Sequence, residues 1–381
     1  MRSSSDQGES PAESEGPRRA RPTRREALAA TGAAVLGGAI GYVAARGARA
    51  RDAGVAGQGG GDGSEPTIAV VDRRDGITWP QSPPRHTLVA VVELGGVGAA
   101  RVLEAARAVR AAVAPPPEDA APLTVLVGLG VPIAHELFPE RCARVAGLPE
   151  FSGDAAGIRR GGELMLMISA ETVAAVRDAC ADALGALGAH RVLWSQTGFR
   201  DAPSPAGTTR SGIGFVDGIV NPRTAEALQA GVWTGGGRRD TFLVVRRMPI
   251  DRAFSELPVE AQEQAIGRHK RDGAPLSGGS TMDDIDLLAK HPDGRTKTPR
   301  DAHARRAHPA NIGRPLMLRR SYSFDDGAES GMLFVAAVAD PETFVLTQRR
   351  LDEADELLRH ASTTAGDCFF IPEELSAPTA G

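Results

Sequence analysis

The sequence predicts an α+β fold made of two related halves, each with an antiparallel sheet flanked by helices. Short β-rich runs fall into two sets along the chain, and one strand–turn–helix pattern occurs in both. The segment ELMLMISAETVAAVRDACADALGAL, from residue 163, resembles MLFVAAVADPETFVLTQRRLDEADELL, from residue 332. Two β-α-β-β-α-β units would produce this internal similarity.

Strands are expected where β-branched and other apolar residues form short runs. The runs are 86–94, 123–129, 163–169 and 191–197 in the first half, then 241–247, 317–324, 332–338 and 368–371 in the second. Apolar residues at helical spacing predict helices over 99–113, 171–187 and 341–359. The stretch 198–212 is rich in Pro and Gly, so we expect halves at 67–205 and 206–376.

Composition excludes several classes of function. The chain has 381 residues, with 44 Lys and Arg against 48 Asp and Glu, so no basic excess favours binding to nucleic acid. Its 3 cysteines lie far apart without a CxxC pair, which disfavours a disulfide scaffold or a four-cysteine zinc site. The 8 histidines are more informative, because a neutral imidazole can ligate iron or another metal.

Residues 1–50 predict an export signal. Arg24 and Arg25 precede an uncharged stretch, Ala27 to Ala45, that is mostly Ala and Gly. A twin-arginine pair before a weakly hydrophobic segment is typical of export by the Tat translocase, whereas a membrane anchor would favour Leu. Residues 51–66 predict a flexible linker. Because this route carries folded proteins, we expect a cofactor enzyme that is extracellular, periplasmic or on the outer face of the cytoplasmic membrane.

One candidate site segment is 212–223, where Asp217 lies between Gly214 and Gly218. Glycines allow the backbone to approach a flat ligand closely while the carboxylate faces it. For an isolated Asp-Gly pair, an ordinary turn is the more frequent interpretation.

A second candidate segment is 303–322, in which His303 and His308 precede a strand that carries Arg319 and Arg320. Taken alone, the histidines are more typical of surface residues, and their spacing is a weak zinc pattern. The two segments become informative only in combination.

Together these segments resemble the dye-decolorising (DyP-type) haem peroxidases, in particular the Tat-exported bacterial branch that includes deferrochelatase-like enzymes. Residues 214–218 match the family's GxxDG motif, with Asn221-Pro222 as its usual extension. Residues 302–309 resemble its proximal-histidine segment and 318–323 its distal-arginine strand, in the expected order. The resemblance implies two ferredoxin-like halves of the dimeric α+β barrel type, with one haem b in the second.

The resemblance also implies residue roles. His303 is expected to ligate the haem iron, and Asp352 or Asp355 to accept its other N–H. Asp217 is expected to move a proton and Arg319 to stabilise negative charge. Further residues expected at the haem or its propionates are Gly218, Ile219, Val220, Arg305, His308, Pro309 and Ala310.

The implied function is a peroxidase that uses hydrogen peroxide to oxidise dyes, phenols or related one-electron donors through a ferryl intermediate. The alternative is an exported protein that handles haem or iron without turnover, which would need His303 but not the pair of Asp217 and Arg319. Three departures from the family pattern stand out: Ala304 and Arg306 replace common aliphatics, Ser321 replaces a common glycine, and 252–300 is short and polar. The sequence leaves the oligomeric state open, and a homo-oligomer is one of the possibilities.

Overall fold

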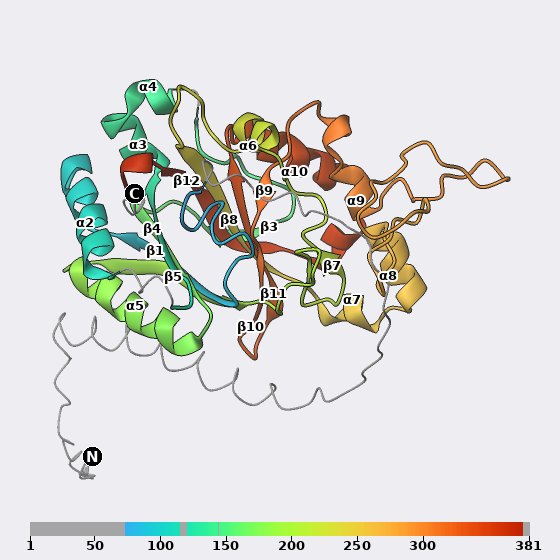
Figure 1. Cartoon of the computed structure of the whole chain (residues 1–381), viewed down its shortest axis with the longest axis horizontal. Helices are drawn as coiled ribbons and strands as arrows, with labels where there is room; N and C mark the ends of the chain where they lie inside the picture. Colours follow the sequence, from blue (N-terminus) through green and yellow to red (C-terminus); the bar gives the residue numbers. More distant parts are fainter. Residues whose placement is uncertain (1–72, 115–119, 144, 376–381) are drawn as a thin grey trace, which may run out of the picture.

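The structure, a computed structural model, describes residues 73–114, 120–143 and 145–375 (Figure 1). The predicted export signal and linker, residues 1–66, lie outside the described residues. Within the described ranges, no helix is long and apolar enough to cross a membrane.

Two sets of strands build the main sheet. The first half contributes β1 (His86–Glu93), β2 (Leu123–Gly130), β3 (Asp154–Arg159), β4 (Leu164–Ala170) and β5 (Arg191–Phe199). The second contributes β8 (Thr241–Pro249), β9 (Leu318–Arg319), β10 (Tyr322–Asp325), β11 (Ser330–Val338) and β12 (Thr363–Ile371). Two short strands, β6 (Thr209–Arg210) and β7 (Val216–Asp217), pair separately.

The main sheet closes into a barrel. Its strand order is β10-β5-β1-β4-β2-β12-β8-β11-β9, and β10 also pairs with β11, which returns the path to its start. The first half contributes the order β5-β1-β4-β2 and the second β12-β8-β11 followed by β9 or β10, which is the same arrangement repeated. The predicted α+β fold of two ferredoxin-like halves is therefore confirmed.

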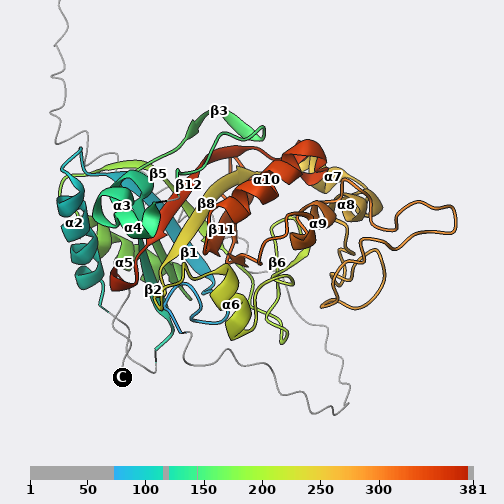
Figure 2. The same cartoon turned by 90° about the horizontal axis from the view of Figure 1, so that it is seen from above.

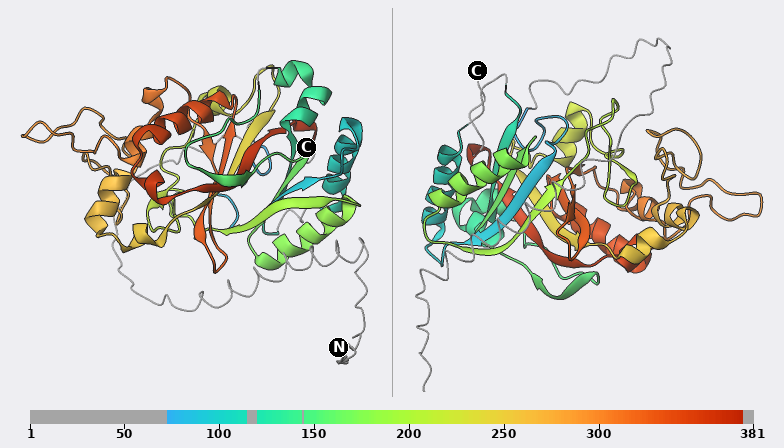
Figure 3. Two further views of the ribbon diagram at one scale, coloured as in Figure 1. Left: turned by 180° about the vertical axis from the view of Figure 1, so that it is seen from behind. Right: turned by 90° about the horizontal axis from the view of Figure 1, so that it is seen from below.

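Helices cover the outside of the barrel at two places. The first half carries α2 (Ala99–Ala112), α3 (Val131–Leu137), α4 (Pro139–Cys142) and α5 (Val173–Ala186). The second carries α6 (Ala225–Gly231), α7 (Arg252–Glu256), α8 (Val259–Ile266), α9 (His303–Arg306) and α10 (Glu342–Ala354), with 3-10 turns η2 (Pro309–Asn311), η3 (Leu357–His360) and η4 (Glu373–Leu375). Figure 2 shows α2–α5 and α7–α10 on opposite sides of the sheet, and Figure 3 shows the same separation from behind and below.

Alternating side chains explain why the strands bury both faces. In β1, Leu88, Ala90 and Val92 pack with the helices of the first half, whereas Val89 and Val91 join the core inside the barrel. Successive residues of a strand point to opposite faces, so an almost continuous apolar run supplies both cores.

Two predicted elements are interrupted in the structure. The strand expected over 317–324 is split into β9 and β10, and at the break the backbone N–H of Val335 in β11 donates to the hydroxyl of Ser321 at 3.2 Å instead of to a backbone carbonyl. The helix expected over 341–359 ends at Ala354, and Asp355 has extended backbone. Strand β3 was not predicted, since its sequence DAAGIR lacks a β-rich run and none of its residues is buried.

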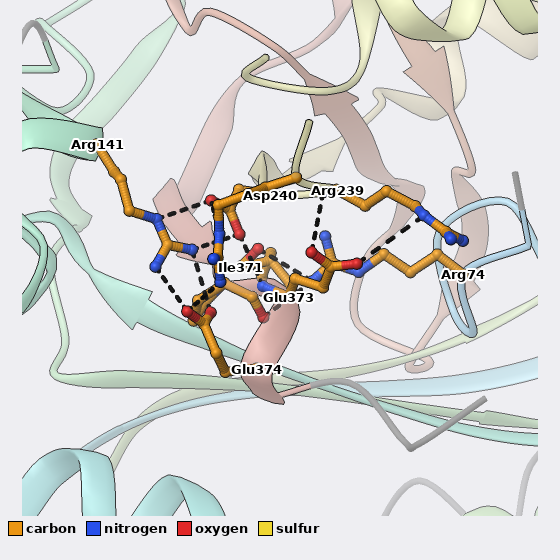
Figure 4. A network of polar contacts seen from close by, with 9 residues as sticks. Arg74, Arg141, Arg239, Asp240, Ile371, Glu373 and Glu374 are labelled. Carbon is orange, nitrogen blue, oxygen red and sulfur yellow. Dashed lines mark hydrogen bonds and ion pairs between the residues drawn. The ribbon is translucent and has the colours of Figure 1, made fainter. Parts of the chain in front are cut away.

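A polar network joins the end of the described chain to the barrel (Figure 4). Asp240, whose side chain is 1% exposed, accepts from Arg141 Nε at 2.7 Å and from the backbone N–H of Glu373 at 2.8 Å. Glu374 is partly buried, which alone would raise its pKa, but hydrogen bonds and charge from Arg141 lower that pKa to about 2. This network ties η4 to α4 and to the loop before β8.

The predicted boundary at 205/206 falls between β5 and β6. Strand pairs β5–β10 and β2–β12 join the two halves into one sheet. The exact division stays a prediction.

Candidate active site

A cavity lies between the outer face of the second half's sheet and the helices α8 to α10. Its space amounts to about 1660 Å³, including the part open to solvent. Most of its lining is apolar, including Met248, Ile250, Phe334, Phe344 and Leu351. Such a cavity suits a large, mainly apolar ligand that a few polar groups orient.

His303, the first residue of α9, lines this cavity and is oriented by a buried carboxylate. Its Nδ1 lies 2.9 Å from Oδ2 of Asp355, whose side chain is 0% exposed. Burial lowers the pKa of His303, but the charge and hydrogen bond of Asp355 outweigh that effect and raise the pKa overall. With Nδ1 bonded to Asp355, Nε2 has no hydrogen-bond partner among the described residues and can act as a metal ligand.

The structure decides between the two carboxylates that the sequence left open. Asp355 lies just beyond the end of α10, and its other oxygen accepts from the backbone N–H of Leu358 at 2.9 Å. Asp352 instead accepts from Gln348 Nε2 at 2.7 Å and from the backbone N–H of Ser152 at 3.1 Å. Asp355 is therefore the partner of His303.

Arg306, a departure from the family pattern, clamps α9 to α10. Its Nε donates to the carbonyl of Arg350 at 3.0 Å, and Nη2 contacts Glu353 at 2.6 Å. The backbone N–H of Glu356 also donates to the carbonyl of Asp301 at 3.0 Å. Polar contacts thus fix the segment that holds His303.

His308 also lines the cavity, but both of its ring nitrogens are engaged. Nδ1 accepts from the backbone N–H of Ala310 at 3.2 Å, and Nε2 lies 2.9 Å from Oδ2 of Asp284. A histidine ligates a metal through an unprotonated nitrogen with a free lone pair. His308 offers neither nitrogen, which leaves His303 as the candidate ligand.

Asp217 and Arg319 line the same cavity from β7 and β9. Oδ1 of Asp217 lies 3.7 Å from Nη2 of Arg319 and accepts from the backbone N–H of Gly218 at 2.7 Å. Gly218 has φ 85°, a left-handed conformation that glycine adopts without steric cost. Arg319 Nε is buried without a hydrogen-bond partner among the described residues, so this cation retains an unused donor.

Asn221 holds Arg319 in place. Its Nδ2 donates to the carbonyl of Arg319 at 3.1 Å, and its Oδ1 accepts from the N–H of Arg319 at 3.0 Å. Because Asn221 lies four residues after Asp217 in the chain, one amide fixes the separation of the two charged groups. Sequence reasoning assigned this residue no role; its place after the GxxDG motif was the only signal.

The cavity includes some of the expected lining residues and omits others. Those that line it are Asp217, Ile219, Val220, His303, His308, Pro309 and Arg319. Gly218, Arg305 and Ala310 do not, although Arg305 Nη1 is buried without a hydrogen-bond partner in the described structure. Sequence reasoning missed Arg268, Asp284 and Ile285, which lie in the polar region 252–300 and line the cavity.

Comparison with known proteins identifies the family. The family pattern described as Dyp-type peroxidase, C-terminal, matches residues 208–376. Over 284 residues the chain is 36% identical to a dye-decolorizing peroxidase of Thermobifida fusca, covering 66% of this chain and 65% of that protein. Among solved structures, an X-ray generated oxyferrous complex of DtpA from Streptomyces lividans has 30% identity and a TM-score of 0.69, covering 78% of this chain and 91% of that one. The chain belongs to the DyP-type peroxidase family.

Other DyP-type relatives agree in fold and in sequence. A deferrochelatase of Yersinia pestis is 32% identical over 284 residues, covering 65% of this chain and 63% of that protein. A DyP-type peroxidase from Cellulomonas bogoriensis has 28% identity and a TM-score of 0.70, covering 84% of this chain and 98% of that one. The chain spans just under two thirds of the length of the curated relatives named here.

Haem is the cofactor of DyP-type peroxidases, and the cavity residues fit it. His303 presents an unpartnered Nε2, which is the group that haem iron requires. The walls are mainly apolar, and the buried Nε of Arg319, which lines the cavity, lacks a partner among the described residues. Such a cation is suited to the anionic propionates of haem or to an anionic species at the iron.

Proposed function

We propose that this DyP-type chain is a haem peroxidase that reduces hydrogen peroxide with electrons from dyes, phenols or related donors. The observation that carries the proposal is that His303, Asp217 and Arg319 line one cavity. Bound haem would supply a redox-active iron that takes up electrons one at a time. One peroxide, two electrons and two protons give two waters, so two donors each lose one electron.

His303 would hold the iron through Nε2, on the side of the cavity next to α10. Asp355 keeps the Nδ1 proton in place and makes the imidazole a stronger electron donor. The clamp of Arg306 on α10 keeps the α9 segment in the orientation that this contact requires.

Asp217 and Arg319 would act on peroxide. The carboxylate of Asp217 takes the proton from one peroxide oxygen and returns it to the other, which leaves as water. The guanidinium of Arg319 stays charged and stabilises the negative charge that develops as the O–O bond breaks.

Variants of these two residues test the proposal. Asp217→Asn should slow the reaction with peroxide by about 10²–10⁴ and flatten the acidic limb of the pH profile. Arg319→Leu should slow it by about 10²–10³ and keep that limb, because the carboxylate of Asp217 is still present. Stopped-flow mixing of each holoenzyme with peroxide across pH measures both. Wild-type rates in Asp217→Asn would rule out its role as the proton shuttle.

A protein that only handles haem or iron would need His303 but not the charged pair. The presence of Asp217 and Arg319 in the same cavity favours the peroxidase. Peroxide-dependent oxidation of a dye by the purified holoprotein distinguishes the two functions. His303→Ala should lose most bound haem, since both ring nitrogens of His308 are engaged.

We further propose that the Tat translocase exports the chain across the cytoplasmic membrane, to an extracellular, periplasmic or outer-face location. The support is the pair Arg24 and Arg25 before a weakly hydrophobic stretch. Replacing both arginines by lysine should leave the protein in the cytoplasm. Unchanged export would indicate another route.

A further inference from the structure

A second cavity lies beside the first, with about 950 Å³ of space including the part open to solvent. It is formed where the ends of β5 and α7 meet the antiparallel pair β10–β11. Ser211, Ile213, Ile250 and Met332 line both cavities. A molecule in this β10–β11 cavity would therefore be separated from the cofactor cavity by one layer of side chains.

The lining of the β10–β11 cavity favours a small, uncharged aromatic ligand with a hydroxyl group. Its polar groups are mostly serine hydroxyls, and one cation balances one anion. Its aromatic surface comes from Phe199, because the ring of Phe324 is buried in the core inside the barrel. These residues are Ser211, Ser255, Ser323, Ser330, Phe199, Phe324, Arg252 and Asp325. Hydroxyls can both donate to and accept from a phenol, and aromatic rings pack against its face.

Size and charge disfavour a large anionic dye in this cavity. With open space included in both, this cavity holds about 950 Å³ against about 1660 Å³ for the first, so it suits a ligand smaller than the cofactor. A polyanionic ligand would find only Arg252 to pair with, while Asp325 would repel it.

We propose that the β10–β11 cavity is the binding site for the electron donor, and that the donor it takes is a neutral, single-ring phenol. This inference rests on the proposed peroxidase function. The bound phenol would give one electron to the redox-active cofactor, across the layer of side chains that includes Ile213 and Met332, and its hydroxyl proton to water. Two phenols, reacting in turn, supply the two electrons that reduce one peroxide to two waters.

Helix α7 offers a matched pair of variants. Ser255 and Glu256 are neighbours and both are exposed, but only Ser255 lines the cavity. Ser255→Trp would place an indole at the cavity, and Glu256→Trp would place the same group one residue further on. Because both positions are exposed, neither change disturbs the core.

The test compares the two variants with wild-type holoenzyme, using 2-methoxyphenol as the probe. Equilibrium dialysis measures its binding, and steady-state oxidation measures its KM. We expect Ser255→Trp to raise both Kd and KM by about tenfold or more, and Glu256→Trp to change them less than twofold. Oxidation of a bulky sulfonated dye should change less than twofold in Ser255→Trp.

Three results would overturn the inference. Equal phenol binding in Ser255→Trp and wild type would exclude the cavity as the site. Equal losses in both tryptophan variants would assign the effect to α7 rather than to the cavity. An equal loss of dye oxidation in Ser255→Trp would exclude selectivity for a neutral single ring.

The peroxide step, measured by stopped flow without donor, separates this inference from the proposed function. If the wild type does not react with peroxide, the peroxidase proposal fails, and dialysis still decides whether the cavity binds the phenol. If peroxide reacts normally and the two variants bind the phenol equally, only the donor-site inference fails.

Discussion

Replacing Asp355 by asparagine tests how the buried carboxylate controls His303. Asp355 accepts two hydrogen bonds, from His303 Nδ1 at 2.9 Å and from the backbone N–H of Leu358 at 2.9 Å. Each carboxylate oxygen accepts one of these two hydrogen bonds. An asparagine has similar size but only one acceptor oxygen, so one of the two donors loses its partner and the negative charge is lost in both contacts.

The expected loss can be estimated from these contacts. Hydrogen bonds to a charged group contribute about 1.5–3 kcal/mol and neutral ones about 0.5–1.5 kcal/mol, so removing the charge should cost about 1–2 kcal/mol at His303. This corresponds to roughly 5- to 30-fold weaker haem binding, near the roughly 10–100-fold effect typical of residues that orient metal ligands.

The pH dependence has a definite sign. Asp355 raises the pKa of His303, so in the apoprotein their ion pair stabilises the fold below the ordinary histidine pKa. That contribution is lost as pH rises through the raised pKa. Haem iron needs the neutral imidazole, so haem binding should tighten over the same range. In Asp355→Asn burial dominates, and the transition should move to lower pH.

Titrating haem into the apoprotein at several pH values, followed by absorption, measures affinity and its pH dependence together. Asp352→Asn is the matched control, because Asp352 lies in the last turn of α10, three residues before Asp355, but contacts Ser152 and Gln348 instead. Equal weakening by both variants, or wild-type affinity and pH dependence in Asp355→Asn, would refute the assignment.

Three further predictions concern other contacts. Asn221→Ala removes both hydrogen bonds to the backbone of Arg319 and should slow the reaction with peroxide, measured by stopped flow, by about 10–100-fold. The holoenzyme should keep its haem spectrum. An unchanged rate would contradict the positioning role of Asn221. Glu374→Gln should lower the free energy of unfolding at pH 7 by at most about 1 kcal/mol, because the group is partly exposed, and so lower the Tm slightly. The difference should fade as pH drops from about 4.5 towards about 2, and a pH-independent difference would contradict the ion-pair account. Gly218→Ala forces a left-handed conformation on alanine and should lower thermal stability by about 1 kcal/mol or more; unchanged melting would contradict the strain expected there.

The sequence determined the elements whose signal is local. Both faces of strands such as β1 and β4 are buried, and this produces apolar runs that identify them without knowledge of their partners. The repeated strand–turn–helix pattern corresponds to β4–α5 and β11–α10, the same steps of the two halves. The motif around Asp217 and the segment from His303 to Arg319 could likewise be identified from the sequence, because the functional residues of each lie within a short stretch of chain.

Tertiary structure alone decided which of these groups meet. Asp352 and Asp355 look alike in sequence; α10 ends between them, so only Asp355 turns towards His303. The clamp of Asn221 on Arg319 joins residues 98 positions apart, and the β10–β11 cavity exists only once the sheet has closed. Periodicity reports whether a residue is buried, but a hydrogen bond between distant side chains depends on where the barrel brings their backbones, which no local pattern specifies.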